Sequence, residues 1–126
     1  MLELVSSSGY AETLDRLVDA IASRGLMVFA QIDHAAAAQG VDMDLAAEVV
    51  VVFGNPRAGT PLMQEDPRVG IELPLRMLIW DRGDAVIVGY NDPRELARSY
   101  TVSRLTATLE AMASLLADIA REAAEA

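Results

Sequence analysis

The sequence predicts an α+β domain with one sheet and two helices, in the order β-α-β-β-β-β-α. Two segments, one ending near Arg24 and one beginning near Ser103, carry apolar residues at intervals of three and four, which is typical of amphipathic helices. The remaining apolar segments are short, rich in β-branched residues and bounded by turn-forming residues, which indicates strands. The 126 residues contain no internal repeat and no linker, so we expect a single domain over residues 1–126.

The first strand and the first helix are predicted near the N-terminus. Leu2–Ser6 is a strand candidate, and Ser7–Gly9 supplies capping residues before a helix that carries Glu12 in its first turn. The apolar positions of this helix lie on one face: Leu14, Leu17, Val18 and Ile21. Arg24 and Gly25 provide a cation for the last turn and a glycine after it, so the helix should end there.

Two further strands and a long loop follow. Met27–Asp33 is rich in β-forming residues, and His34–Gly40 is expected to form a turn or a single helical turn. Val49–Phe53 contains four consecutive valines and predicts a strand that ends at the sequence Gly-Asn-Pro of residues 54–56. Residues 55–74 hold four of the five prolines, so we expect a long irregular loop there, and loops of that length are usually functional or disordered.

The second half of the chain predicts a hairpin and a long helix. Leu75–Trp80 and Ala85–Tyr90 are strand candidates joined by the turn sequence Asp-Arg-Gly-Asp of residues 81–84. Asp92 followed by Pro93 is a common way to start a helix. The last helix presents one apolar stripe, formed by Leu105, Leu109, Met112, Leu116, Ile119 and Ala123.

The strand composition also predicts self-association. A sheet with helices on one face and water on the other should alternate apolar and polar residues. Val49–Phe53 and Ala85–Val88 do not alternate, so both faces of these strands should be covered, and two helices can cover only one face. We therefore expect a homodimer in which a second copy of the chain covers the other face.

Charge and composition exclude several functions. The net charge is −9, and the ten basic residues, all arginine, are scattered, so the chain lacks the basic stripe that nucleic-acid binding needs and is repelled by anionic membranes. No secretory signal and no apolar stretch long enough to span a bilayer is visible, and we expect a soluble cytoplasmic protein. The absence of cysteine excludes disulfides, thiolate nucleophiles and cysteine-ligated metals.

Four sequence segments, taken in this order and spacing, resemble the family called domain of unknown function 302. They are Phe29-Ala-Gln-Ile-Asp-His34, Val52-Phe-Gly-Asn-Pro-Arg-Ala-Gly-Thr60, Ile71-Glu-Leu-Pro-Leu75 and Tyr90-Asn-Asp-Pro93. The resemblance covers essentially the whole chain and implies a β-α-β(4)-α fold of the TATA-binding-protein-like or helix-grip type. It further implies that strands two to five form an antiparallel meander, with two helices on one face of the sheet. It implies no reaction. A fold shared with a DNA-binding protein does not imply that this chain binds DNA.

Asp33 and His34 are the only neighbouring carboxylate and imidazole in the chain. A histidine of ordinary pKa suits general acid–base catalysis, which would make the protein a small hydrolase or isomerase. Adjacent residues of a strand point to opposite faces, so the favoured interpretation is a solvated histidine and an aspartate that caps the following turn. Adding Glu72 would complete a His/carboxylate metal set, but spacing alone does not support it, and no metal or cofactor is predicted.

The loop at Asn55 is the preferred candidate for a binding site. Asn55, Arg57 and the backbone amides around them suit an anion or a carboxylate, whereas on turn chemistry alone Asn55 would cap its own backbone. Trp80 and Tyr90 suit the wall of an apolar pocket, although such residues are more often core or interface.

The sequence contains no nucleophile elbow, phosphate-binding loop or zinc-protease motif, so no catalytic residue is assigned. Three functions stay open: a module that binds a small molecule between the sheet and residues 55–74, a small enzyme that uses Asp33 and His34, and a purely structural dimer. The ligand-binding set under the first hypothesis is Asp33, His34, Asn55, Arg57, Glu72, Trp80 and Tyr90.

Overall fold

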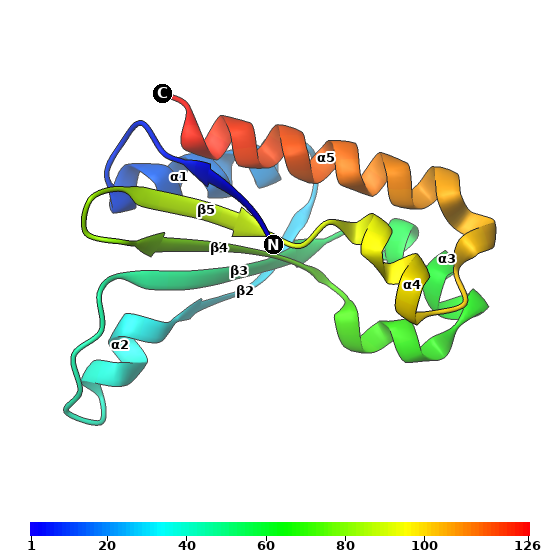
Figure 1. The fold of residues 1–126 in the computed structure, drawn as a ribbon, viewed down its shortest axis with the longest axis horizontal. Coiled ribbons are helices and arrows are strands. Elements are labelled where there is room, and N and C mark those ends of the chain that lie inside the picture. The colour runs from blue at the N-terminus through cyan, green and yellow to red at the C-terminus, as the bar shows by residue number, and fades with distance from the viewer.

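The computed structural model describes residues 1–126 and confirms the predicted α+β fold (Figure 1). The strands are β1 (Leu2–Val5), β2 (Met27–Asp33), β3 (Glu48–Gly54), β4 (Leu75–Asp81) and β5 (Val86–Tyr90). The α-helices are α1 (Tyr10–Ser23), α2 (His34–Gln39), α3 (Pro56–Glu65), α4 (Leu96–Ser99) and α5 (Thr106–Ala124). Three 3₁₀ helices complete the chain: η1 (Pro67–Glu72), η2 (Pro93–Glu95) and η3 (Ser103–Leu105).

The five strands form one antiparallel sheet in the order β1-β5-β4-β3-β2. Strands β2 to β5 are sequential neighbours and form the expected meander, while β1 pairs with β5 at the edge. In the register of the central pairs, Val51 lies opposite Met77 and Leu78 lies opposite Gly89. Strand β2 contains a bulge between Val28 and Ala30, which places Phe29 outside the regular register.

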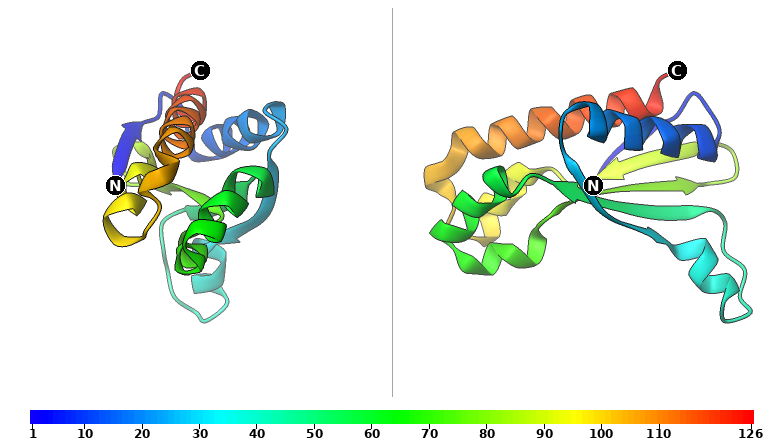
Figure 2. Two further views of the ribbon diagram at one scale, coloured as in Figure 1. Left: turned by 90° about the vertical axis from the view of Figure 1, so that its right-hand side faces the viewer. Right: turned by 180° about the vertical axis from the view of Figure 1, so that it is seen from behind.

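Helices α1 and α5 cover one face of this sheet, as the two views of Figure 2 show. Val49, Val51 and Phe53 of β3 are buried beneath these helices, together with apolar side chains of α1 and α5 such as Leu17 and Ile119. The intervening β3 residues are half-buried and point to the opposite side of the sheet. We call that opposite side the open face. Its residues include Val5, Ala30, Ile32, Glu48, Val50, Val52, Arg76, Leu78, Trp80 and Ile87.

The prediction of an irregular loop over residues 55–74 is wrong, because most of the segment is helical. Asn55 caps α3 by accepting a hydrogen bond of 2.9 Å from the amide of Arg57, and Pro56 occupies the first turn, where a missing N–H costs nothing. Asp66 caps η1 in the same way. Buried Leu62 and Val69 pack against α5, so tertiary contacts hold these short helices in place.

Helix α1 begins where the sequence predicted, with Gly9 of the expected capping residues as the N-cap and Glu12 in the first turn. Gly9 provides no side-chain hydrogen bond. The hydroxyl groups of Ser6 and Thr13 instead form a buried hydrogen bond of 2.6 Å, and Thr13 donates to the carbonyl of Gly9. At the other end the prediction is confirmed: Gly25 has a positive φ of 69°, which a glycine adopts without strain.

A protruding segment, residues 34–47, connects β2 to β3, and we call it the arm. It comprises α2 and the loop that follows, and it extends from the sheet on the side away from α1 and α5 (Figure 1). Three large apolar side chains of its loop are exposed: Val41 (67%), Met43 (64%) and Leu45. The arm therefore presents apolar surface that nothing within one chain covers.

Candidate functional site

Two cavities lie on either side of the segment Leu73–Leu75, at the end of the sheet away from the arm. Leu73 and Leu75 line both of them. One cavity is small and apolar, and the other is larger and polar. We refer to them as the apolar cavity and the polar cavity.

The apolar cavity has a volume of about 210 Å³ and lies between the sheet and residues 55–74. Only two of its lining residues, Asn55 and Thr60, carry polar side chains. The others are Phe29, Gly54, Pro56, Ala58, Gly59, Met63, Gly70, Leu73, Pro74, Leu75 and Met112. The cavity thus draws its walls from β2, β3, α3, η1 and α5, which is where the sequence predicted a pocket.

The cavity has room because Gly59 and Gly70, which line it, have no side chains. A Cβ at Gly59 would lie 3.5 Å from Leu73 Cδ1 and 3.9 Å from Met63 Cε, both of which line the cavity. A Cβ at Gly70 would lie 3.3 Å from Met63 Sδ. Larger side chains at these positions would therefore meet the cavity wall.

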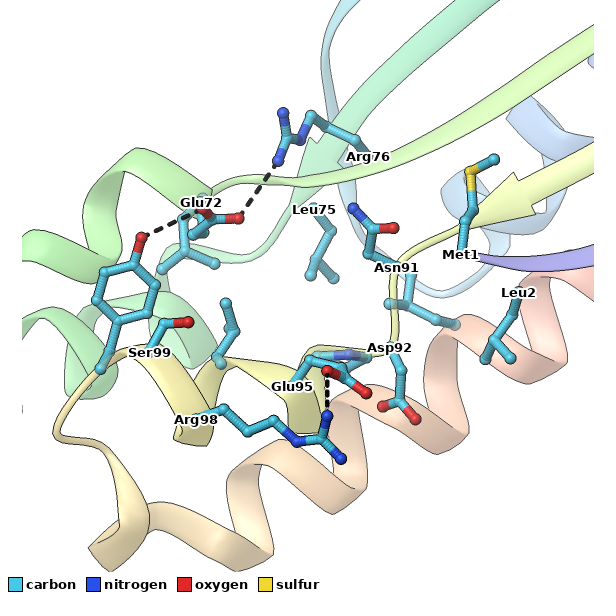
Figure 3. Close-up of a pocket in the computed structure, with 15 residues that line it drawn as sticks. Met1, Leu2, Glu72, Leu75, Arg76, Asn91, Asp92, Glu95, Arg98 and Ser99 are labelled. Atoms are coloured by element: carbon cyan, nitrogen blue, oxygen red, sulfur yellow. Dashed lines mark hydrogen bonds and ion pairs between the residues drawn. The ribbon is translucent and has the colours of Figure 1, made fainter.

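The polar cavity, of about 510 Å³, lies between the start of β4, the segment 91–100 and α5 (Figure 3). Its charged side chains already have partners within the chain. Glu72 accepts a hydrogen bond of 3.2 Å from Tyr100 Oη and forms an ion pair of 3.6 Å with Arg76. Arg98 pairs with Glu95 at 3.3 Å. Burial raises the pKa of Tyr100, and its hydrogen bond to Glu72 raises that pKa further.

Asp66 connects η1 to the segment between α4 and α5. The residue is 4% exposed, and its carboxylate accepts hydrogen bonds from the backbone amide of Thr101 (2.9 Å) and from Nε and Nη2 of Arg68 (3.0 and 2.9 Å). The Arg68 side chain, followed by the Thr101 amide, holds the pKa of Asp66 well below its usual range. These hydrogen bonds tie the start of η1 to the segment between α4 and α5.

The structure does not bring all seven predicted site residues together. Asp33 and His34 lie at the base of the arm, and neither lines either of the two cavities. Asp33 is the N-cap of α2 and accepts a hydrogen bond of 2.8 Å from the amide of Ala36. This agrees with the favoured interpretation of the sequence, in which Asp33 caps the turn that follows it. In the β2–β3 register, Asp33 pairs with Val49 and Met27 pairs with Gly54, so Asp33 and Asn55 lie at opposite ends of the sheet.

The remaining predicted residues are dispersed as well. Asn55 lines the apolar cavity and Glu72 lines the polar one, whereas Arg57 is exposed and lines neither. Trp80 lies half-buried on the open face, and Tyr90 is buried in the core, where burial raises its pKa. No group of three or more histidine, aspartate or glutamate side chains is arranged to hold a metal ion.

Sequence reasoning placed the apolar cavity but missed most residues that form it. Phe29 reaches the cavity because the β2 bulge re-aims it, and a bulge leaves no clear sequence signal. Met112 belongs to the apolar stripe of the last helix, which the sequence assigned to the core alone. The signal that pointed to the cavity was the density of glycine and proline in residues 55–74.

Fold and site together define a small α+β domain with one helix-covered sheet face, one open face and a cavity at the end of the sheet. The chain belongs to the family described as domain of unknown function DUF302, whose model matches residues 2–122. A crystal structure of an uncharacterized conserved DUF302 protein from Bacillus stearothermophilus is similar in fold, with a TM-score of 0.87. That similarity covers 97% of this chain and 96% of the other, at 20% sequence identity.

The chain is also similar to longer proteins. It is 34% identical over 103 residues to fluoride-specific ion channel FluC 1 of Brucella suis and to FluC 2 of Brucella melitensis. The match covers 81% of this chain but only 41% and 38% of those relatives, so the chain spans about two-fifths of their length. None of the helices in the structure is both long enough and apolar enough to cross a membrane.

Proposed function

We propose that this domain binds a small, uncharged, largely apolar molecule in the apolar cavity. The observation that carries the proposal is the cavity itself: about 210 Å³, apolar on nearly all sides, with two polar side chains among its lining residues. Ligand sites are typically apolar clefts in which a few polar groups set orientation. An engineered cavity of about 150 Å³ takes up benzene, so this volume suits a bicyclic aromatic compound or a short aliphatic chain.

Hydrogen bonding in the first turn of α3 favours an uncharged ligand over an anion. Asn55 Oδ1 accepts from the amide of Arg57, and the carbonyl of Asn55 accepts from the amides of Ala58 and Gly59. At the start of a helix, N–H groups of this kind attract anions when they are free. Here they are already hydrogen-bonded to Asn55, so they are not available to an anionic ligand. Arg57 lies outside the cavity, so no cation compensates an ionised ligand there.

The polar cavity is the weaker candidate. Its glutamates and arginines are paired with each other, and a charged ligand would have to displace the Glu72–Arg76 and Glu95–Arg98 ion pairs. The acid–base alternative also has less support, since the Asp33 carboxylate is committed to capping α2 and lines neither the apolar nor the polar cavity. Fluoride conduction is named for relatives that are more than twice as long as the matched region.

Indole is a suitable first probe, because it is bicyclic, uncharged and carries one donor. The proposal predicts saturable binding by calorimetry. Gly59→Leu, which directs a side chain toward Leu73 and Met63, should weaken binding at least tenfold. Gln64→Leu is the matched control, since it adds the same side chain to the exposed part of α3 outside the cavity. Equal indole affinity for both variants would overturn the proposal.

A further inference from the structure

The polar cavity holds positive and negative charges in balance. Three carboxylates and two arginines line it. One of the carboxylates, Asp92, is neutralised from outside the lining by Arg94, whose Nη2 donates to it at 2.6 Å. The other two carboxylates form ion pairs with the two arginines of the lining. The cavity as a whole therefore attracts neither anions nor cations, and it suits a ligand that carries one charge of each sign.

The two ion pairs lie on opposite sides of this cavity (Figure 3). Glu72 and Arg76 form one side, and Glu95 and Arg98 form the other. Their N···O distances are 3.6 and 3.3 Å, and each of the four side chains is at least 36% exposed. Exposed ion pairs contribute little to stability, so a ligand displaces them at small cost. A ligand with a single charge gains a contact at one side only, whereas a zwitterion gains contacts at both sides.

The region between the two ion pairs is apolar. In Figure 3, Leu75 lies between Arg76 and Glu95. Four leucines line the cavity, of which the first named is buried and the others are half-buried: Leu116, Leu73, Leu75 and Leu96. Burial of an aliphatic group against these side chains is favourable, so the middle of the ligand should carry one.

The lining also contains two uncharged polar side chains, those of Asn91 and Ser99. No hydrogen bond joins either of them to another lining residue (Figure 3). An asparagine amide both donates and accepts hydrogen bonds, and so does a serine hydroxyl. These groups suit a ligand with N–H and C=O groups between its charged ends, which is the chemistry of a peptide.

We infer that the polar cavity binds a short peptide with an apolar side chain and holds it by both of its ends. Glu72 binds the peptide's ammonium group, and the hydrogen bond of 3.2 Å from Tyr100 orients the Glu72 carboxylate. Arg98 binds the peptide's carboxylate, since its side chain is 79% exposed and free to form two parallel hydrogen bonds with that group. A free amino acid carries both charges on one carbon atom and so does not reach both sides of the cavity. The apolar cavity takes no part, so the proposed function and this site stand or fail independently.

Calorimetry with the tripeptide Ala-Leu-Ala tests this site. Saturable binding is expected, and free leucine should bind at least tenfold more weakly. Acetylation of the tripeptide's amino group, or amidation of its carboxyl group, removes one charge and should also weaken binding at least tenfold. An absence of saturation up to millimolar tripeptide, or undiminished affinity for either capped form, would overturn the inference.

Glu72→Gln tests the amino end. The glutamine carbonyl still accepts from Tyr100, while the charge is lost. Affinity for Ala-Leu-Ala should fall at least tenfold, but affinity for the acetylated form should not change, because acetylation has already removed the same interaction. Glu65→Gln, at an exposed residue of α3 that lines neither cavity, is the matched control. If Glu72→Gln weakened neither form, or both equally, the inference would be wrong.

Arg98→Gln tests the carboxyl end by the same logic. It should weaken binding of Ala-Leu-Ala at least tenfold and leave the affinity for the amidated form unchanged. Arg104→Gln removes the same charge from an exposed residue outside both cavities and should have no effect. Equal losses for the free and amidated forms would contradict a contact between Arg98 and the peptide carboxylate.

Discussion

The carboxylate of Asp66 accepts a hydrogen bond of 2.9 Å from the backbone amide of Thr101, 35 residues later in the chain. This contact joins η1 to the segment that leads into α5. Since residues of η1 and α5 line the apolar cavity, the hydrogen bond holds two of its walls at a fixed separation. A buried carboxylate with four hydrogen-bond donors is stable only while it is ionised.

Asp66 should make the stability of the domain depend on pH. Its pKa is lower in the folded chain than in the unfolded one, so its contribution is complete above the ordinary carboxyl pKa, near 4, and is lost as the pH falls below that value. Asp66→Asn should therefore lower Tm at pH 7 and flatten the dependence of Tm on pH below about pH 4. Asp84→Asn, which removes an exposed partner of Arg82, is the control. If the Tm of Asp66→Asn fell below pH 4 as steeply as the Tm of the wild type, this account would be contradicted.

Gly89 should be intolerant of a side chain although it lies in a regular strand. A Cβ there would come within 3.1 Å of both Trp80 Cζ3 and Met1 Sδ, on the open face. Gly89→Ala should lower the free energy of unfolding by about 1–3 kcal/mol through overpacking. Trp80 is the only tryptophan, so its emission should shift to longer wavelength as its ring is displaced. An unchanged spectrum and stability would show that the ring moves freely.

At Gly59, in contrast, an added methyl group should stabilise the domain. It lies inside α3, its φ is not positive, and the nearest atom to an added Cβ would be at 3.5 Å, an ordinary contact distance. Gly59→Ala should raise the free energy of unfolding by about 0.5–1 kcal/mol, because alanine loses less backbone entropy in a helix. Urea unfolding measures this change. A loss of stability would mean that the cavity wall at Leu73 does not tolerate a methyl group.

The buried pair Ser6–Thr13 should stabilise the junction of β1 and α1. Thr13 is fully buried, and Thr13→Val keeps its shape while leaving Ser6 without its 2.6 Å partner. The expected cost is about 1–3 kcal/mol in the free energy of unfolding. In Thr13→Val the Ser6 hydroxyl keeps longer hydrogen bonds, to the Ala124 carbonyl at 3.4 Å and from the Ser8 amide at 3.2 Å. Adding Ser6→Ala removes the other member of the pair, so the double variant should lose less than the sum of the two single variants. Additive losses would argue against a direct interaction.

The strands and the two long helices were predictable because burial on one face leaves a periodic pattern. Val49, Val51 and Phe53 alternate with half-buried residues, and the stripe of the last helix packs as its spacing indicated. The helix over residues 56–65 was not predictable, since Gly59 and Pro61 lower its intrinsic propensity. Burial of Leu62 against α5 stabilises this helix and compensates for its low intrinsic helix propensity.

The candidate site was predictable in place but not in composition. Clustered glycine and proline marked residues 55–74, and the cavity lies there. The polar residues chosen as ligand contacts, such as Arg57 and His34, instead lie elsewhere on the chain surface or at the base of the arm. Apolar lining residues such as Phe29 and Met112 carry no pattern that separates a cavity wall from a core, because both bury the same side chains.

Titration of ¹⁵N-labelled protein with indole, followed by amide chemical shifts, tests the ligand site most directly. The account predicts saturable shifts that concentrate on the amides of Gly54, Gly59 and Gly70, which line the apolar cavity. The amides of Asp33 and His34, at the opposite end of the sheet, should not move. An absence of shifts up to millimolar indole, or shifts that concentrate around the polar cavity at Asn91–Ser99, would contradict it.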